Sequence, residues 1–332
     1  MKKYFLGVDG GNTKTDYLLY TTDGEYADMH RTGTCSHEQF GNGFAGMEKA
    51  MSAQLSELFA RNGISVKNIE AAGFGLAGAD LPYQVAELKK RVESIGFTQY
   101  GLFNDGILGI KAASENGVGL CVVNGTGTVV IGADTCGKFL QVGGVGSLSG
   151  DTAGGTYIRD RIITFMYAHY YRCGAESSMF ADVMRLIDAN PQDLSAVISD
   201  YPALEKHMTD IIKIGVKAAL AGDAVAKKIF DDVGISIAKS AAGCIRNLGF
   251  KGFGTEENPI DIIKVGTIWK IPYDGMNAAF IKTVSELSGK TCRIVNLKAP
   301  AAAGGVLWAK EIADGIVPDP EYRKKVLNRP WA

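Results

Sequence analysis

The sequence has no surplus of charge of either sign. Its 332 residues include 35 Lys and Arg against 36 Asp and Glu, which gives a formal net charge of −1 at pH 7. Proteins that coat nucleic acid or lie on an anionic membrane carry an excess of Lys and Arg, because cations neutralise the phosphate groups. The balance argues against both kinds of partner. Charged residues at 21% and apolar residues at 46% are typical of a folded globular chain.

Metal-binding cysteine patterns and long apolar runs are also missing. No Cys forms a C-x-x-C pair or a Cys/His cluster with zinc spacing, and we interpret the thiols as free in a reducing compartment. The six cysteines are Cys35, Cys121, Cys136, Cys173, Cys244 and Cys292. No run approaches the roughly 18 apolar residues of a membrane helix. The apolar stretch at residues 4–7 is too short for a signal peptide. We expect a cytoplasmic protein.

Glycine, in contrast, is abundant. The chain has 42 Gly, which gather in short turns rather than recurring at a fixed spacing. The excess over the usual share of about 7% therefore indicates functional turns. A chain of 332 residues, at about 150 residues per domain, favours two domains.

One supersecondary unit occurs twice. Residues 5–24 contain an apolar strand, a glycine-rich turn with Asp9 and Thr13, a returning strand and an Asp-containing turn. Residues 119–137 repeat this order, with Asn124 and Thr126 at the glycine-rich turn. An internal repeat of this kind predicts two related domains that face each other.

Apolar spacing predicts the remaining elements. Strands are expected at residues 69–76, 101–103, 261–265 and 293–297, between helices, which together indicate an α/β fold. Helical spacing is found over residues 44–61, 82–95, 107–115, 179–187, 208–220, 225–245, 276–287 and 301–312. The tail from residue 315, with three Pro, is expected to wrap over the surface.

Two common phosphate-binding motifs do not apply. The chain has no G-x-x-x-x-G-K-[ST] and is therefore not a P-loop nucleotidase. The match to G-x-G-x-x-G at residues 73–78 lies largely inside a predicted strand, and no acidic residue closes a following strand about 20 residues later. This position argues against a dinucleotide site.

The two glycine-rich turns can instead form a phosphate clamp. Gly10, Gly11, Gly125 and Gly127 lack side chains, so phosphate groups can approach their backbone N–H groups. Hydroxyl donors are supplied by Thr13, Thr126 and Thr128, and a positive charge by Lys14. Asp9 can hold Mg²⁺ through water, the binding mode that this ion prefers. The alternative is two ordinary hairpins with glycine for turn geometry.

Six short motifs occur in order and carry a resemblance to a known family. They are Val8-Asp9-Gly10-Gly11-Asn12-Thr13-Lys14-Thr15, Gly75-Leu76-Ala77-Gly78, Asn104-Asp105-Gly106, Asn124-Gly125-Thr126-Gly127-Thr128, Gly143-Gly144-Val145-Gly146 through Gly150-Asp151, and Val265-Gly266-Thr267-Ile268-Trp269-Lys270. With these motifs, residues 4–310 or so resemble the N-acetylglucosamine kinase group. That group stands with the benzoyl-CoA-reductase-activator-type ATPases in the actin-like sugar-kinase superfamily.

The resemblance implies two ribonuclease-H-like domains with ATP and Mg²⁺ in the cleft between them. The first domain would be residues 1–115, completed by the C-terminal helix 301–332, and the second would be residues 116–300. The implied activity is transfer of phosphate from ATP to the 6-hydroxyl of N-acetylglucosamine or a close derivative such as N-acetylmuramic acid. We expect this amino sugar as the small-molecule partner, and a homodimer.

The resemblance also assigns roles to residues. Asp105 would be the catalytic base that accepts the proton of the sugar 6-hydroxyl, although Asp is equally suited to cap helix 107–115. Asp151 would contact the sugar or metal, or else cap a helix near Ala153. The implied sugar site is Ser36, His37, Gly78, Asp105, Thr126, Gly127, Gly144, Val145 and Asp151. The ATP site would be Gly10, Gly11, Asn12, Thr13, Lys14, Gly125, Thr126, Gly266, Thr267, Gly304 and Gly305.

Three positions depart from the group's pattern. His37 stands for its sugar-contacting Asn, Val145 for a Trp, and Thr152 for a Glu. Val145 is smaller than Trp and predicts a wider pocket. The imidazole of His37 can carry charge near a pKa of about 6.5, which would suit the lactyl carboxylate of N-acetylmuramic acid.

Two other functions stay open. One is an ATP-driven activator with an iron–sulfur cluster on cysteines of paired subunits. The other is a non-catalytic sugar-binding regulator.

Overall fold

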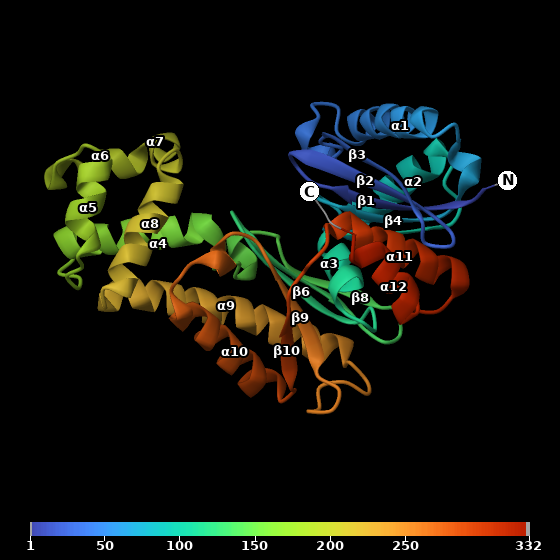
Figure 1. Ribbon diagram of the computed structural model, residues 1–332. Coiled ribbons are helices and arrows are strands. Elements are labelled where there is room, and N and C mark those ends of the chain that lie inside the picture. Colours follow the sequence, from blue (N-terminus) through green and yellow to red (C-terminus); the bar gives the residue numbers. More distant parts are fainter. Residues whose placement is uncertain (1, 330–332) are drawn as a thin grey trace.

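Two five-stranded sheets of the same topology organise the molecule, whose computed structural model describes residues 2–329 (Figure 1). The first sheet has the order β3-β2-β1-β4-β5 and the second, read from the equivalent edge, the order β8-β7-β6-β9-β10. The first sheet consists of β1 (Tyr4–Gly10), β2 (Lys14–Thr21), β3 (Tyr26–Gly33), β4 (Ile69–Leu76) and β5 (Tyr100–Phe103). The second consists of β6 (Gly119–Asn124), β7 (Thr128–Ala133), β8 (Phe139–Gly143), β9 (Ile260–Val265) and β10 (Cys292–Val295).

Strand directions also agree between the sheets. The first three strands of each sheet are antiparallel neighbours, and the last two are added in parallel. The repeated topology confirms the internal repeat and the α/β fold of two ribonuclease-H-like units, the architecture of actin-like ATPases. The division at residues 115 and 300 stays a prediction.

Helices cover both faces of the first sheet. On one face, α1 (Phe44–Arg61) and α2 (Pro82–Ile95) enclose a core with the apolar side chains of β1, β2 and β4. On the other face lie α11 (Ala301–Asp314) and α12 (Pro320–Leu327). The tail thus forms a helix against the sheet, and Figure 1 shows both red helices beside β1 and β4. The helix α3 (Gly106–Ala113) packs between Trp308 of α11 and the second sheet.

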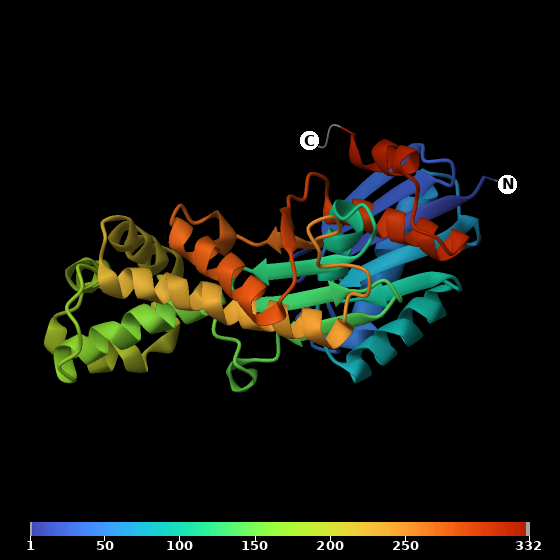
Figure 2. The same cartoon turned by 90° about the horizontal axis from the view of Figure 1, so that it is seen from below.

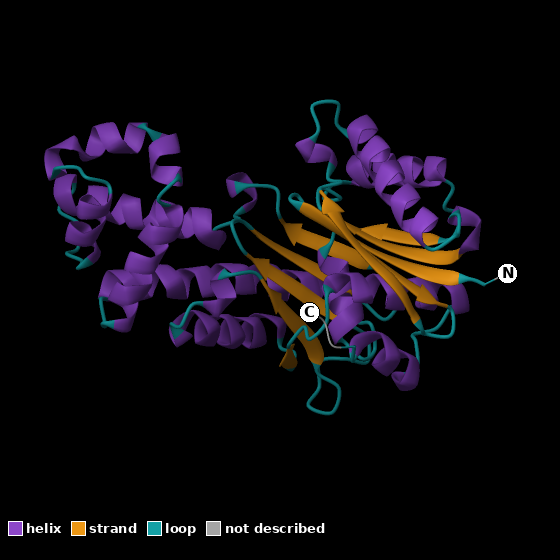
Figure 3. Ribbon diagram, turned by 45° about the horizontal axis from the view of Figure 1, so that its top comes forward, coloured by secondary structure: helices purple, strands orange, loops and turns teal. Residues whose placement is uncertain are grey.

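The second sheet continues into a helical end. The long α9 (Ala224–Leu248) and α10 (Asp274–Ser288) pack together, and α4 (Gly154–Tyr171) contacts α9. Figures 2 and 3 show that the helices beyond them lie far from the first sheet and give the molecule an elongated outline. They are α5 (Met179–Leu186), α6 (Leu194–Ser199), α7 (Tyr201–Glu205) and α8 (Met208–Leu220). Over residues 2–329, no helix has the length and apolar character needed to cross a membrane.

Glycine allows α11 to approach the first sheet unusually closely. A Cβ atom at Gly305 would lie 2.7 Å from the Cα of Gly7 and 2.8 Å from the carbonyl oxygen of Gly73. A Cβ atom at Gly304 would collide with the carbonyl oxygen of Leu108 in α3. These contacts fix α11 between the sheet and α3, and α3 begins directly after Asp105.

Candidate active site

Three charged side chains form a row across the first three strands. Asp9 of β1 lies opposite Asp16 of β2, and Asp16 lies opposite Arg31 of β3. Because facing residues in adjacent antiparallel strands point to the same side, all three side chains share one face of the sheet. Burial, together with the negative charges of Asp105 and Asp16, raises the pKa of Asp9 to about 7. A cation or a proton at Asp9 is therefore favoured.

Asp105 lies two residues after β5, at the N-cap position immediately before α3. Its carboxylate makes no capping hydrogen bond, whereas the side-chain oxygen of Asn104 accepts the N–H of Gly106 at 3.0 Å. Burial and the negative charge of Asp80 raise the pKa of Asp105 to about 6. Asp105 thus holds the N-cap position without a capping bond from its carboxylate, and this carboxyl group is poised to exchange a proton near neutral pH.

A small polar network beside Asp105 was not predicted from the sequence. Asp80 follows β4, and its Oδ1 accepts hydrogen bonds from Nδ2 of Asn104 at 2.8 Å and from Nε2 of Gln141 at 3.0 Å. Asn104 directly follows β5 of the first sheet, and Gln141 belongs to β8 of the second. The network therefore joins the two sheets next to Asp105.

The second glycine-rich turn rests on the beginning of α4. The carbonyl oxygens of Gly125 and Thr126 accept the N–H groups of Gly155 and Thr156 at 2.7 and 3.1 Å. A Cβ atom on Gly154 would come within 2.6 Å of the Thr126 oxygen, so the close approach depends on glycine there. This packing holds the turn and leaves Thr126 and Gly127 exposed.

A cavity of about 590 Å³ opens beside this turn. Gly125, Thr126 and Thr267, all expected at the ATP site, line it together with apolar side chains of α8 and of the segment 268–272. Gly266 does not line it, but its backbone packs against Asn124 and Gly125. The volume and the apolar lining suit a flat heterocycle such as a nucleotide base.

The other expected ATP residues are distributed differently. Gly11, Asn12, Thr13 and Lys14 form the turn after Asp9, with the last three side chains exposed and Gly10 buried. Gly304 and Gly305 are not at the cavity. They lie inside α11 with no exposed surface to offer a ligand, since their backbones pack against β1, β4 and α3. Both glycines allow close helix packing, and their part in an ATP site stays a prediction.

His37 lies between Phe44 and Gly78. Its ring stacks on Phe44 with centroids 4.2 Å apart, and a Cβ atom on Gly78 would meet it at 2.6 Å. Burial lowers the pKa of His37, although Glu38 and Asp80 act in the other direction. This shift favours the uncharged ring and weakens the expectation of a cation at His37. The neighbouring Ser36 is buried, and its hydroxyl has no partner among the described residues.

The loop after β8 is held by Asp151. Oδ2 of Asp151 accepts the N–H groups of Val145 at 2.9 Å and Gly146 at 2.7 Å. Ala153, not Asp151, is the residue that precedes α4, so Asp151 organises the loop instead of capping the helix. Gly144 and Val145 are exposed on this loop, and Val145 is 54% accessible. The loop therefore leaves the space beside Val145 open.

The two cysteines that flank the β6–β7 hairpin lie in different surroundings. Cys121 is fully buried in β6 against Gly109, and burial raises the pKa of its thiol. Cys136 is exposed in the turn between β7 and β8. Within the described part of the chain, no three His, Cys, Asp or Glu side chains are grouped to hold a metal ion.

Comparison with known proteins places these features in a wider context. The model of the BadF/BadG/BcrA/BcrD ATPase family matches residues 6–309. The N-acetylmuramic acid/N-acetylglucosamine kinase of Clostridium acetobutylicum is 21% identical over 319 residues, which cover 94% of this chain and 100% of the relative. The N-acetyl-D-glucosamine kinase of Dictyostelium discoideum is 20% identical over 258 residues, which cover 75% of this chain and 81% of the relative.

Solved structures share the fold over nearly the whole length. A candidate N-acetylglucosamine kinase from Chromobacterium violaceum superposes with a TM-score of 0.62 at 22% identity, over 92% of this chain and 99% of that one. The ROK hexokinase from Thermus thermophilus gives a TM-score of 0.51 at 16% identity, over 92% and 97% of the two chains. At these identities the likeness establishes a common fold.

Proposed function

This chain belongs to the BadF/BadG/BcrA/BcrD ATPase family, and from that premise we propose that it is an ATP-dependent amino-sugar kinase. The substrate is N-acetylglucosamine or N-acetylmuramic acid, and the phosphate goes to the 6-hydroxyl. Full-length similarity to a kinase of both sugars supports this substrate class. The homodimer and the cytoplasmic location expected from the sequence stay predictions.

The observation that carries the proposal is the carboxyl group of Asp105. It makes no helix-capping hydrogen bond, and its charge acts on Asp9. Burial raises the pKa of both residues, to about 6 and about 7, and the charge of Asp105 contributes to the shift at Asp9. A carboxylate with a pKa near 6 is ionised at neutral pH yet basic enough to take a proton from a hydroxyl as it attacks phosphorus. A carboxylate whose only role was to cap the helix would instead accept a hydrogen bond from a backbone N–H group of α3.

In the proposed reaction, Asp105 accepts the proton of the sugar 6-hydroxyl while that oxygen bonds to the γ-phosphorus of ATP. The bond from this phosphorus to the bridging oxygen breaks, and ADP leaves with the electron pair. Positioning and charge neutralisation account for most of the catalysis of such transfers. The turn of residues 10–14 and the turn of residues 125–127 would position the phosphates, and the cavity beside Thr267 would hold the base.

The residues at Asp9 fit a magnesium ion bound mainly by nucleotide and water. Asp9 is close enough to Asp16 and Asp105 that their negative charges raise its pKa, and a divalent cation would relieve this repulsion. Mg²⁺ commonly uses one or two carboxylates, with the phosphates and water supplying the other ligands. When bound, the ion would neutralise charge on the transferring phosphate.

His37, Ser36, Gly78 and the loop of residues 143–151 would surround the sugar. Exposed Val145 leaves room above the loop, which supports acceptance of a sugar with a bulky substituent at C3. The uncharged His37 offers a hydrogen bond rather than a charge to that substituent. We therefore propose that space, and not ion pairing, admits N-acetylmuramic acid.

The function is tested by an ADP-release assay over a panel of amino sugars and neutral hexoses with Mg²⁺ and ATP. We expect ADP release that depends on N-acetylglucosamine or N-acetylmuramic acid and is much weaker with glucose. ADP release at the same rate without any sugar would favour an ATPase that activates a partner. Nucleotide binding without turnover on any sugar would favour a regulator.

A further inference from the structure

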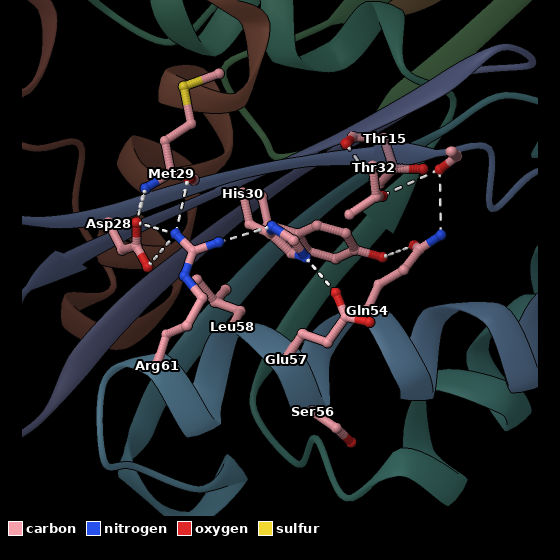
Figure 4. Close-up of polar contacts among 12 residues, drawn as sticks. Thr15, Asp28, Met29, His30, Thr32, Gln54, Ser56, Glu57, Leu58 and Arg61 are labelled. Carbon is pink, nitrogen blue, oxygen red and sulfur yellow. Dashed lines mark hydrogen bonds and ion pairs between the residues drawn. The ribbon is translucent and has the colours of Figure 1, made fainter.

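The side chains of β3 point alternately to the two faces of the first sheet. Asp28 and His30 face α1, where Arg61 bonds both of them and Glu57 bonds His30 (Figure 4). Met29 packs in the opposite core with α11. Because successive residues of a strand alternate, Arg31 shares the face of Met29. That is also the face of Asp9 and Asp16.

Arg31 is held in place by a buried carboxylate. Its Nε donates to Oδ1 of Asp16 at 2.6 Å and its Nη2 to Oδ2 at 2.9 Å. Only 4% of the Asp16 side chain is exposed, against 57% of the Arg31 side chain. Burial pushes the pKa of Asp16 up, but its bonds to Arg31 and the charge of Lys14 outweigh this and lower it. A two-point bond of this geometry fixes the plane of the guanidinium group.

Lys14 adds a second cation to the same carboxylate. Its Nζ lies 3.4 Å from Oδ2 of Asp16, and half of its side chain is exposed. Lys14 belongs to the turn after Asp9, so the two cations flank Asp16 next to Asp9. Lys14 and Arg31 thus place two positive charges beside Asp16 and Asp9, and burial together with the repulsion between these two carboxyl groups raises the pKa of Asp9. An ion pair with a purely structural role would need only one cation to balance the charge of Asp16.

The Arg31 guanidinium keeps donors for a ligand. Over residues 2–329, no protein group accepts a hydrogen bond from its Nη1. Guanidinium groups donate in a planar fork that matches phosphate oxygens, and they remain charged at all physiological pH values. Asp9 feels the positive charge of Arg31, which acts to lower the pKa of Asp9. The guanidinium is therefore near the carboxylate proposed to face the nucleotide phosphates.

From this arrangement we propose that Arg31 is a phosphate-binding residue of the nucleotide site and that Asp16 positions it. The proposal rests on the function proposed above, because it takes the turn of residues 10–14 as the phosphate site. It adds a residue from the third strand, outside every motif in the sequence. Lys14 would act beside it as a flexible second cation.

The test compares how strongly variants bind adenosine, ADP and the non-hydrolysable β,γ-imido analogue of ATP, measured by calorimetry. We expect Arg31→Ala to bind adenosine within twofold of the unmodified protein and the imido analogue at least tenfold more weakly, with ADP between them. Arg31→Lys should recover part of the loss, since it restores charge without the fork. Asp16→Asn should weaken the analogue more than adenosine.

Arg61→Ala is the matched control. It also removes an Asp–Arg pair from β3, on the other face of the sheet, and should leave all three affinities unchanged. Equal weakening of all three ligands in Arg31→Ala would mean that the pair only stabilises the strand, and unchanged binding of the analogue would also overturn the proposal. If the unmodified protein binds none of the ligands, the proposed function itself fails. If it phosphorylates sugar and Arg31→Ala does so with the same KM for ATP, only the role of Arg31 fails.

Discussion

Nε2 of Gln141 donates a hydrogen bond of 3.0 Å to Oδ1 of Asp80, and this contact joins β8 of the second sheet to the end of β4 in the first. The same oxygen accepts Nδ2 of Asn104, the residue before Asp105. Through Asp80, the relative position of the two sheets therefore affects the surroundings of Asp105, the residue proposed as the base. Its negative charge also raises the pKa of Asp105.

Asp80→Asn should move the pH dependence of the reaction. The unmodified enzyme is expected to lose kcat/KM for the sugar as the pH falls through about 6, where Asp105 becomes protonated. Removing the neighbouring negative charge lowers the pKa of Asp105, so the acid limb should shift to lower pH. The measurement is the pH profile of kcat/KM at saturating ATP. Asp28→Asn, in the network of Figure 4, should leave the limb in place. An unshifted limb in Asp80→Asn would contradict this coupling.

Asp105→Asn should retain the fold and nucleotide binding while turnover is lost. The amide is nearly isosteric with the carboxyl group but cannot accept the proton, and a positioned base contributes about 10²–10⁴-fold to the rate. We expect kcat to fall by that factor and the sugar affinity to change much less. Steady-state kinetics and sugar titration check this together. Turnover near that of the unmodified enzyme would remove Asp105 from the mechanism.

Gly305→Ala should destabilise the protein without acting on the nucleotide site. The added Cβ atom would press on Gly7 and Gly73, and overpacking of this kind costs about 1–3 kcal/mol. We expect a lower melting temperature and an unchanged KM for ATP in the folded fraction. Gly243→Ala, in the interior of α9 with open space around it, should be neutral or slightly stabilising. A raised KM for ATP with an unchanged melting temperature would return Gly305 to the nucleotide site.

Val145→Trp should narrow the sugar pocket. The indole would stand where the exposed Val145 now leaves space, and the lactyl group of N-acetylmuramic acid would meet it first. We expect kcat/KM for this sugar to fall at least tenfold relative to N-acetylglucosamine, which corresponds to about 1.4 kcal/mol of transition-state binding. Competition between the two sugars in one reaction gives the ratio directly. Equal slowing of both would show that the loop does not select the sugar.

Local sequence patterns were sufficient for most elements of the fold. The predicted segments 44–61, 69–76, 82–95 and 208–220 coincide with α1, β4, α2 and α8, because their apolar residues follow the period of the element and meet one core. The strand β3 gave no such signal. It is an edge strand whose residues are mostly partly exposed or exposed, so its side chains do not alternate between apolar and polar.

The site was only partly accessible from sequence for a related reason. Gly125 and Thr126, which line the cavity, are neighbours in one turn, so their motif can be recognised from the sequence alone. Asp80 and Gln141 are 61 positions apart and meet only when the two sheets are placed together. Arg31 acquires its position from Asp16 on a neighbouring strand. Gly304 and Gly305 show that a motif-like pair can also be required for close helix packing, which the sequence alone does not reveal.

The central claim is that the chain transfers the γ-phosphate of ATP to the 6-hydroxyl of an amino sugar. The most direct measurement is phosphorus and carbon NMR of the product formed from N-acetylglucosamine, ATP and Mg²⁺. We expect one sugar phosphate, with phosphorus coupled to C6, formed in equal amount with ADP. Inorganic phosphate appearing in place of a sugar phosphate, or phosphorus coupled to C1, would contradict it.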